Sequence, residues 1–436
     1  MLNSDQQKAL QFIKQWWFSD HQCMVLDGKG GTGKSFLIEE VVRTLPNISP
    51  LILCPTHEAL KQIKEKVHLP DNLFKTAHSA LGIAPIDDDK ELKFEQLKLP
   101  SLWDKINFVV ADECSMYSEQ IMNLLIRTNT KILFVGHHSQ LPPVKKQRRT
   151  SDPCISPVFM QEFPTVTLTI PQRNTGKLWD FNNLLETQIY QQGSVVVPND
   201  YDISKKELSY YIMENGKDKI FTGETKFVLW SNAGVDAYNT RLRKNFFGEK
   251  AASHKYLPGD KIILTKPYTD VMGLEVYNDK RLKDLDKANL PSFFSNAKAE
   301  VLSCEDKVVV LNKYLSIPVY KLHVICEGTK TTFYEPMFPA DHERIADYYE
   351  KQAWDITERA KRTKAYKDRT LIRSCFAEIK HYYAATAHRL QGASIPNIVV
   401  ILSDILRNPN PIERRKCIYV ATSRTIDNLM IYRGIT

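Results

Sequence analysis

A glycine-rich segment near the N-terminus carries the strongest chemical signal in the chain. Gly28-Lys29-Gly30-Gly31-Thr32-Gly33-Lys34-Ser35 fits the pattern G-x-x-x-x-G-K-[ST]. Glycines let the backbone come close enough for its N–H groups to face phosphate oxygens, and a helix that starts after the loop adds its positive end. Lys34 is expected to neutralise the β- and γ-phosphates of ATP, and Ser35 to ligate Mg²⁺. The predicted nucleotide-binding residues of this loop are Gly28, Gly30, Gly31, Thr32, Gly33, Lys34 and Ser35.

Two adjacent acids supply the second half of this chemistry. Asp112 and Glu113 follow the apolar run Phe108-Val109-Val110-Ala111, which is typical of a buried strand. Asp112 is expected to hold Mg²⁺ through its water shell, whereas Glu113 is expected to take the proton of the attacking water. The loop and the acid pair together predict hydrolysis of a nucleoside triphosphate.

Short apolar runs that alternate with helical patterns indicate how these residues are positioned. A first block of expected strands covers 23–26, 51–54, 108–111 and 131–135, and a second block covers 227–230, 397–402 and 428–432. Ser4 and Gln7 fit a capping box for a helix before the first strand, and a helical stripe follows the loop. The fold class predicted is α/β, with two parallel sheets built from βα units.

Two segments interrupt this pattern. Residues 84–103 are expected to form a hairpin that carries Phe94. Residues 251–380 alternate β-branched and polar positions and predict a small β-rich insertion, which ends in a charge-dense helical run at about 344–373. We expect that run to form a solvated helix that covers or extends the insertion.

Composition sets broad limits. The 436 residues are enough for about three folding units. A net charge of +8 suits a polyanionic partner without proving one. The start of the chain lacks the pattern of a signal peptide, and no apolar run reaches the ~18 residues of a membrane span, so a cytoplasmic location is expected. The eight cysteines are widely spaced and are expected to be reduced and mostly buried.

The order of the motifs resembles that of the superfamily 1 helicases, in the branch that holds RecD and Dda. The resemblance covers nearly the whole chain and implies two RecA-like domains around one ATP site. By this resemblance Gln6 reads the adenine, Gln140 of the segment Gly136–Pro143 senses the γ-phosphate, and Arg173 and Arg424 act as arginine fingers. A further segment, 386–394, also fits the family, with Arg389 in place of the usual Lys.

The chain departs from the family at His137, where the usual residue is Asp. The contact that the family's Asp makes, which links the presence of the γ-phosphate to the rest of the protein, is therefore in question. The pair His137-His138 could indicate a metal site, but with no cysteine or third ligand nearby in the sequence the metal reading is set aside.

The resemblance also implies a track for single-stranded DNA. Such a track needs polar or basic groups for phosphates and flat side chains for bases. Phe94 is expected to stack on a base and split the duplex, although it could instead be a packed core residue. The two first-domain histidines could likewise be structural. The predicted DNA contacts are Thr56, His57, His78, Phe94, Asn232, Thr386 and His388.

The implied organisation has four parts. The first RecA-like domain takes 1–83 and 104–150, the hairpin takes 84–103, the second RecA-like domain takes 151–250 and 381–436, and the β-barrel-like insertion takes 251–380. The implied activity is ATP-dependent, 5′-to-3′ unwinding by a monomer acting on single-stranded and forked duplex DNA, with replication or recombination as the setting. Two alternatives stay open: a nucleic-acid-stimulated ATPase or translocase that remodels without unwinding, and a P-loop NTPase switch with a protein partner.

Overall fold

The computed structural model describes most of the chain. The described residues are 2–88, 91–96, 99–143, 152–172, 176–191, 193, 195–215, 219–270, 292–312, 315–354 and 374–434. The chain divides into two compact units. The first unit comprises Met1–Tyr210, Glu224–Val235 and Ala385–Thr436, and the second comprises Tyr211–Gly223 and Asp236–Ala384.

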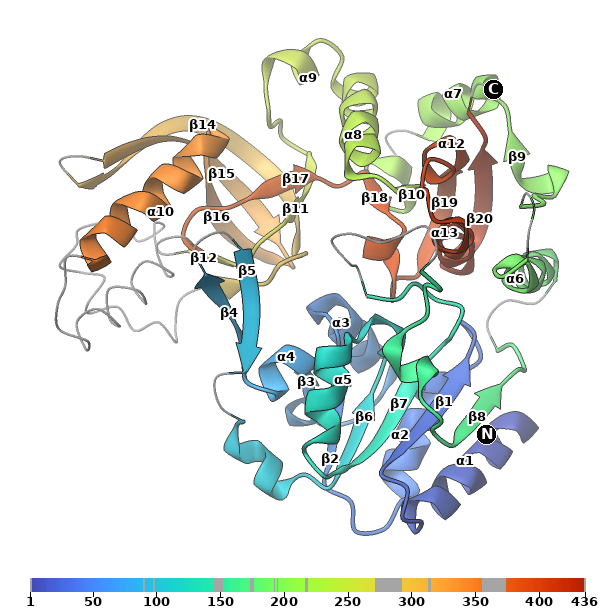
Figure 1. Ribbon diagram of the computed structural model, residues 1–436. Coiled ribbons are helices and arrows are strands. Elements are labelled where there is room, and N and C mark those ends of the chain that lie inside the picture. The colour runs from blue at the N-terminus through green and yellow to red at the C-terminus, as the bar shows by residue number, and fades with distance from the viewer. Residues whose placement is uncertain are drawn as a thin grey trace. The chain divides into compact units, whose positions relative to one another are not determined.

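A six-stranded parallel sheet forms the N-terminal part of the first unit (Figure 1). Its order is β3-β2-β6-β7-β1-β8, and all neighbouring strands run parallel. Its strands are β1 (Cys23–Gly28), β2 (Pro50–Cys54), β3 (Phe74–Thr76), β6 (Phe108–Ala111), β7 (Lys131–Gly136) and β8 (Thr165–Leu168). Every residue of β1 and β6 is buried, as expected for strands covered on both faces.

Helices cover both faces of this sheet, because alternate strand residues point to opposite sides. Met24 and Leu26 of β1 pack with α1, α2 and α3, whereas Cys23 and Val25 pack with α4 and α5. These helices are α1 (Ser4–Trp17), α2 (Lys34–Thr44), α3 (His57–Lys66), α4 (Ala77–Ala80) and α5 (Glu119–Ile126). The carboxyl ends of the strands are thereby left for the loops that carry the predicted chemistry.

The predicted capping box of the first helix is wrong by one residue. Asn3, not Ser4, is the N-cap: its side chain accepts from the backbone N–H of Gln6, and the Gln6 side chain accepts from the backbone N–H of Asn3. Both residue pairs fit the sequence pattern. Asn3 takes the cap because its backbone is extended, which leaves Ser4 inside the helix.

A second parallel sheet completes the first unit. Its order is β18-β10-β19-β20-β9, and the strands from β10 to β9 run parallel. Its strands are β9 (Asp202–Ile203), β10 (Thr225–Leu229), β18 (Ala384–Thr386), β19 (Ile395–Ile401) and β20 (Thr425–Tyr432). The helices of this part are α6 (Lys177–Gln188), α12 (Leu402–Ile405) and α13 (Pro411–Ser423). α7 (Lys205–Asn215) and α8 (Asn232–Phe247) each begin in the first unit and end in the second. The predicted α/β fold with two parallel, RecA-like sheets is confirmed.

A two-stranded antiparallel pair lies within the segment predicted as a hairpin. β4 (Ile83–Asp88) pairs with β5 (Glu91–Gln96), and Pro85 is the register partner of Phe94. The side chain of Phe94 belongs to the part of the chain that the structure does not describe.

The second unit is built on an antiparallel sheet with the order β16-β15-β14-β11-β17. One strand of this sheet, β14, covers 298–312, and its pairing with the next strand continues beyond a register shift between Val301 and Ser303. Its elements are α9 (Lys250–Ser253), β11 (Lys261–Leu264), β12 (Tyr268–Thr269), β13 (Ser292–Phe293), β14 (Lys298–Asn312), β15 (Leu315–Cys326), β16 (Thr329–Pro336), α10 (Pro339–Trp354) and β17 (Ile379–His381). The expected helix at about 344–373 is described as far as Trp354, and 355–373 lie outside the described residues.

A buried ion pair fixes the start of β11 in the second unit. The guanidinium of Arg243 donates to both carboxylate oxygens of Asp260 at 2.8 Å, and the hydroxyl of Tyr383 donates to Asp260 at 2.9 Å. Asp260 is fully buried. A buried charge of this kind is tolerated because its oxygens are satisfied by charged and neutral donors.

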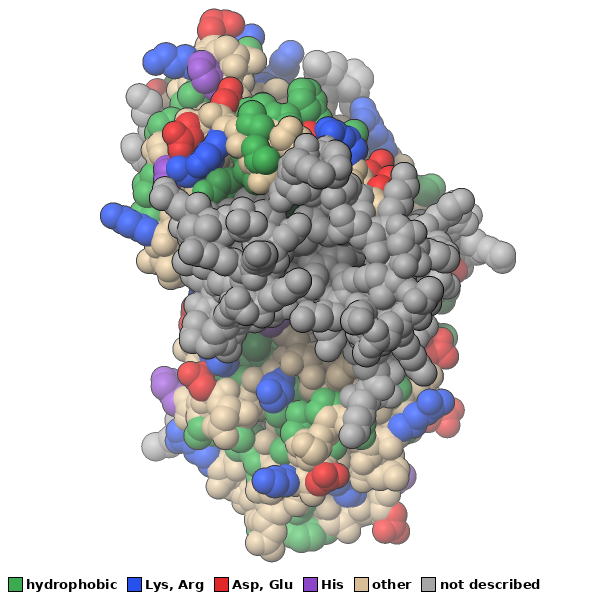
Figure 2. All heavy atoms as spheres, turned by 90° about the vertical axis from the view of Figure 1, so that its left-hand side faces the viewer, with side chains coloured by type: hydrophobic (Ala, Val, Ile, Leu, Met, Phe, Trp, Pro, Cys, Tyr) green, Lys and Arg blue, Asp and Glu red, His purple; other side chains and the backbone are tan. Residues whose placement is uncertain are grey.

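The surface charge is mixed. On the face that Figure 2 shows, lysine and arginine side chains of the described residues are interspersed with aspartate and glutamate. Among the described residues, no helix combines the length and apolarity that a bilayer crossing requires. Seven of the eight cysteines are buried, and Cys304 is half-buried.

Candidate active site

The glycine-rich loop connects β1 to α2 and is shaped by backbone that only glycine adopts freely. Gly33 caps α2 with a φ of 82°, in the left-handed region. A Cβ at this position would also collide with Nε2 of Gln6. The Gln6 amide in turn donates to the carbonyl of Thr32 at 3.3 Å. Gln6, predicted to read the adenine, thus lies against the loop and at the same time caps α1.

Lys34 lies at the first position of α2 and folds back over the loop. Its ammonium donates to the carbonyls of Gly28 and Lys29, the second at 2.9 Å. Burial lowers the pKa of Lys34, and the neighbouring carboxylates of Glu113 and Asp112 partly offset that effect. If a phosphate took the place of these two carbonyls as the partner of Lys34, the ammonium would already be in position beside it.

The two acids follow β6, next to the loop. The backbone N–H of Asp112 donates to the carbonyl of Leu53 at 2.8 Å, which continues the pairing with β2. Glu113 has a φ of 48°, a left-handed conformation that costs a non-glycine residue about 1–3 kcal/mol. This turn separates the directions of the two adjacent carboxylates.

Burial, together with repulsion from Glu113, raises the pKa of Asp112 to about 7, although Lys34 opposes the shift. The ordinary pKa of an aspartate side chain is 3.8. Between pH 4 and pH 7 Asp112 therefore keeps its proton in the folded chain and has lost it in the unfolded chain. The free energy of unfolding therefore falls as the pH rises through this range.

We expect Asp112→Asn to be more stable than the native chain at pH 8 in the absence of Mg²⁺ and nucleotide. The gain should be at most about 4 kcal/mol, from 1.36 kcal/mol for each pKa unit, and should vanish near pH 4. Thermal melts across this pH range would measure it, with Asp427→Asn on an exposed strand position as the control. A gain that does not change with pH would contradict the shifted pKa.

A cavity of about 550 Å³ opens beside the loop and the acids. Segments from both parallel sheets of the first unit line it. Its lining residues are Gly30, Gly31, Gly33, Lys34, Ser35, Phe36, Ala59, Gln62, Ile63, Lys66, Asp112, Glu113, Gln172, Gly392, Ser394, Ser423 and Arg424. Residues predicted from distant motifs therefore meet around one space large enough for a nucleotide.

Gln140 connects an acid to an arginine at this cavity. With its amide oriented so that both ends find partners, Gln140 donates to Glu113 Oε2 at 2.9 Å and to Ser115 Oγ at 2.8 Å, and it accepts from Arg424 Nη2 at 2.8 Å. Arg424 Nη2 also lies 3.7 Å from Glu113 Oε1. The structure thus brings together Glu113, Gln140 and Arg424, which come from three separate motifs.

The second predicted arginine, Arg173, lies outside the described residues. Its neighbour Gln172 lines the cavity, and the backbone N–H of Gln172 donates to the carbonyl of Gly31 at 2.7 Å. Sequence reasoning did not single out Lys66, Gly392 or Ser423 as lining residues. The chain offers no local pattern for Lys66, because it reaches the cavity only through the packing of α3.

The first-domain candidates for DNA contact follow neighbouring strands. Thr56 and His57 come after β2, and His78 comes after β3. The hydroxyl of Thr56 accepts from the backbone N–H of Ala59 at 3.1 Å, so this side chain caps α3. Both histidines are half-buried, and burial lowers their pKa. They offer hydrogen bonds rather than positive charge at neutral pH.

The second-domain candidates lie at or just after the ends of β10 and β18, which are neighbours in the second sheet. Asn232 begins α8 and is exposed. The hydroxyl of Thr386 accepts from the backbone N–H of Arg389 at 3.3 Å. Nε2 of His388 lies 3.2 Å from Oε1 of Glu413. Asn232 is thus the most accessible of the three, whereas His388 faces a carboxylate.

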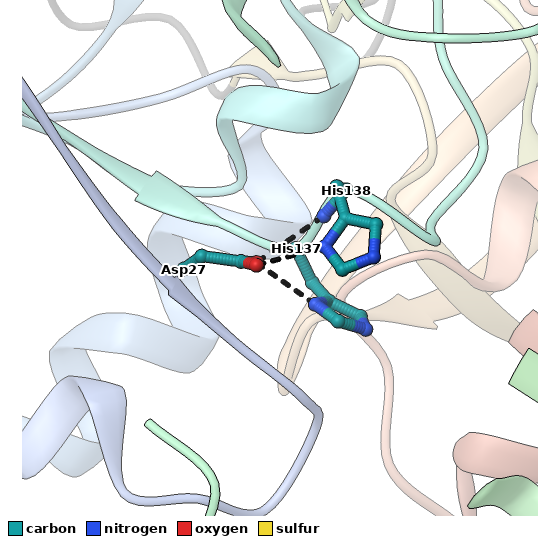
Figure 3. A group of neighbouring side chains, drawn as sticks. All are labelled: Asp27, His137 and His138. Atoms are coloured by element: carbon teal, nitrogen blue, oxygen red, sulfur yellow. Dashed lines mark hydrogen bonds and ion pairs between the residues drawn. The ribbon is translucent and has the colours of Figure 1, made fainter. Parts of the chain in front are cut away.

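A third side chain that could bind a metal does lie beside His137 and His138, so the expectation that no such residue is nearby is wrong. Asp27, at the end of β1, is 2.9 Å from Nδ1 of His137 and 2.7 Å from Nδ1 of His138 (Figure 3). Burial alone would raise the pKa of Asp27, but the hydrogen bonds from the two histidines outweigh it and lower the pKa. Sequence reasoning missed Asp27 because 110 residues separate it from His137.

The chain is similar to known proteins over most of its length. A family model described as "AAA domain" matches residues 13–146. The uncharacterized protein R530 of Acanthamoeba polyphaga mimivirus is 25% identical, over 98% of this chain and 99% of its own length. The ATP-dependent DNA helicase dda of Enterobacteria phage T4 is 24% identical, over 90% of this chain and 91% of its own length. The structure of Pif1 helicase from Bacteroides in complex with ADP-AlF3 and ssDNA superposes with a TM-score of 0.50 at 18% identity, over 100% of this chain and 93% of that one.

Proposed function

Since the chain belongs to the superfamily 1 helicases, we propose that it is an ATP-dependent DNA helicase that moves 5′ to 3′ on single-stranded DNA and unwinds duplex. The observation that carries this proposal is the meeting of Lys34, Glu113 and Arg424 at one cavity lined from two parallel sheets. Two of the relatives support it. The dda protein of phage T4 is an ATP-dependent DNA helicase, and Pif1 helicase from Bacteroides was solved in complex with ADP-AlF3 and ssDNA.

We propose the following roles at the cavity. Gly28, Gly30, Gly31, Thr32 and Gly33 wrap the phosphates with their backbone N–H groups, while Gln6 holds the adenine. Lys34 neutralises charge on the transferring phosphate. Ser35 and Asp112 are the residues that would hold Mg²⁺, whose chemistry is to neutralise phosphate charge. Both are oxygen donors beside the loop, which is the donor type that Mg²⁺ prefers.

Glu113 takes the proton of the attacking water, and Gln140 holds Glu113 and Arg424 in one hydrogen-bonded group. Arg424 and Arg173 are the proposed arginine fingers. Because Arg424 comes from the segment before β20 of the second sheet, its attraction to the γ-phosphate makes closure of the two sheets depend on ATP. Hydrolysis removes that attraction, and repeated closing and opening becomes movement along DNA.

DNA contacts are proposed at the carboxyl ends of both sheets. Thr56, His57 and His78 follow β2 and β3. Asn232 and His388 follow β10 and β18, and Thr386 is the last residue of β18. A monomer with a single ATP site needs no partner to complete it, so a monomer on single-stranded and forked DNA is the proposed form. A cytoplasmic location and a setting in replication or recombination stay predictions.

The test is steady-state ATP hydrolysis with and without single-stranded DNA, followed by unwinding of a forked duplex with a 5′ or a 3′ tail. We expect strong stimulation by DNA and unwinding from the 5′ tail. Stimulation without strand separation would favour the remodelling ATPase, and no stimulation by DNA or RNA would favour the P-loop switch.

Phe94→Ala is expected to reduce unwinding more than DNA-stimulated hydrolysis. Phe94 lies in β5 of the hairpin, and base stacking on an aromatic ring is worth about 1–3 kcal/mol. Unwinding and hydrolysis are measured on the same forked substrate, with the exposed Phe18→Ala as the control. Equal loss of both activities would mean that Phe94 packs in the fold and does not act on DNA.

A further inference from the structure

Two histidines and an aspartate meet at the carboxyl ends of two neighbouring strands, next to the glycine-rich loop, and none of the three is among the residues assigned to nucleotide or Mg²⁺. β1 and β7 pair in parallel with Asp27 opposite Gly136, so the two residues after Gly136 fall beside Asp27. Asp27 and His137 are buried, with exposed fractions of 6% and 2%. The sheet itself therefore holds these side chains together.

The spacing of the three side chains suits a shared metal ion. One oxygen of Asp27 lies 2.9 Å from Nδ1 of His137, and the other lies 2.7 Å from Nδ1 of His138. A ligand atom from each residue lies within 4.8 Å of the other two. Atoms that bind one ion at about 2.1 Å stand about 3.0 to 3.4 Å apart, slightly more than the two distances here, and two imidazoles with one carboxylate form a common transition-metal ligand set. Figure 3 shows the Asp27 carboxylate facing both rings.

A second, independent feature lies on the far side of His137. Nε2 of His137 is 2.8 Å from Oε1 of Glu186 on α6. A histidine that binds a metal through one ring nitrogen usually presents its other N–H to a carboxylate, which fixes the tautomer and orients the ring. The hydroxyl of Ser139 donates to the same Glu186 oxygen at 2.9 Å, and Lys29 pairs with the other oxygen. Glu186 is therefore held within reach of His137 Nε2, although that ring N–H is not aligned for a hydrogen bond to it in this structure.

The cluster is also accessible from solvent through one of its members. The side chain of His138 is 45% exposed, whereas those of Asp27 and Glu186 are 8% and 14% exposed. An ion could arrive on the His138 side and keep water in its remaining coordination positions. The donors are two nitrogens and one oxygen, which favour Zn²⁺, Co²⁺ or Ni²⁺ over Mg²⁺.

We propose that Asp27, His137 and His138 bind one divalent transition-metal ion, and that Glu186 orients His137 for this purpose. The ion would join the residue that precedes the phosphate loop to the end of β7. This inference does not depend on the proposed helicase activity, because ion binding is measured without ATP or DNA.

The full chain, prepared without a histidine tag and stripped by a chelator, is titrated with Co²⁺ and, in competition with a coloured chelator, with Zn²⁺. We expect one equivalent to bind, with a visible Co²⁺ absorption band. His137→Ala and His138→Gln should each weaken binding at least about 100-fold, since loss of an outer-shell partner alone costs about 10- to 100-fold. Glu186→Gln should fall in that smaller range. His21→Ala, which removes an exposed histidine that is not one of the proposed ligands, is the control.

No binding in the micromolar range would overturn the proposal and leave the cluster as a hydrogen-bonded network. Binding that survives His138→Gln, or that excess Mg²⁺ abolishes, would also overturn it. Because His138 is the most exposed of the three ligands, its variant should fold even if His137→Ala does not, and thermal melts without metal would check this point.

Discussion

Replacing Lys34 by alanine is expected to lower ATP hydrolysis at least about 100-fold, with and without DNA. The Lys34 ammonium lies within the loop, held by the carbonyls of Gly28 and Lys29. It is thus the fixed positive charge nearest to the proposed phosphate position. A preorganised charge of this kind is worth about 100- to 1,000-fold in rate because it needs no rearrangement during the reaction.

The measurement is steady-state phosphate release at saturating Mg²⁺ and ATP. Lys8→Ala changes an exposed lysine of α1 and should hydrolyse ATP at the native rate. Melting temperatures of both variants show whether the fold survives. Native turnover by the Lys34 variant would remove the nucleotide site from this loop and, with it, the proposed motor.

Glu113→Gln is expected to separate binding from hydrolysis. The amide keeps an oxygen that can accept from Gln140, so the hydrogen-bonded group with Arg424 should persist. The variant loses the carboxylate that accepts the proton of the attacking water, a step worth about 100- to 10,000-fold. We therefore expect near-native nucleotide affinity with hydrolysis reduced by this factor.

Equilibrium binding of a fluorescent ATP analogue and single-turnover hydrolysis measure the two properties in turn. Glu119→Gln, at an exposed position of α5, is the matched control. Equal loss of affinity and rate would indicate that Glu113 holds the nucleotide or the fold and does not act as the base.

Much of the fold could be predicted because buried parallel strands leave a plain pattern. The run Phe108–Ala111 was predicted and found with the same bounds, since continuous apolar residues between turn signals fit a strand covered on both faces. Local patterns were less decisive where two readings fit equally well. Asn3 and Ser4 are both good caps, and only the backbone of the folded chain selects between them.

Some residues of the candidate site could be predicted from local motifs, and others could not. The loop and acid pair have local signatures, so Lys34, Asp112 and Glu113 could be located from the sequence. The contact between Asp27 and His137 could not, because it depends on β1 lying next to β7, and strand order is a property of the whole sheet. Lys66 was missed for the same reason, since only the packing of α3 brings it to the cavity.

The arrangement of the second sheet sets an order for folding during synthesis. All six strands of the first sheet lie before residue 169, so this sheet can form early in synthesis. β10 must wait for β18 and β19, which emerge only after the whole antiparallel unit has been made. Contacts between segments so far apart form slowly, and an unpaired strand edge invites aggregation meanwhile. Early folding of the intervening unit would bring its two ends together. β10 and β18 would then be close to each other before they pair, and their pairing would be faster.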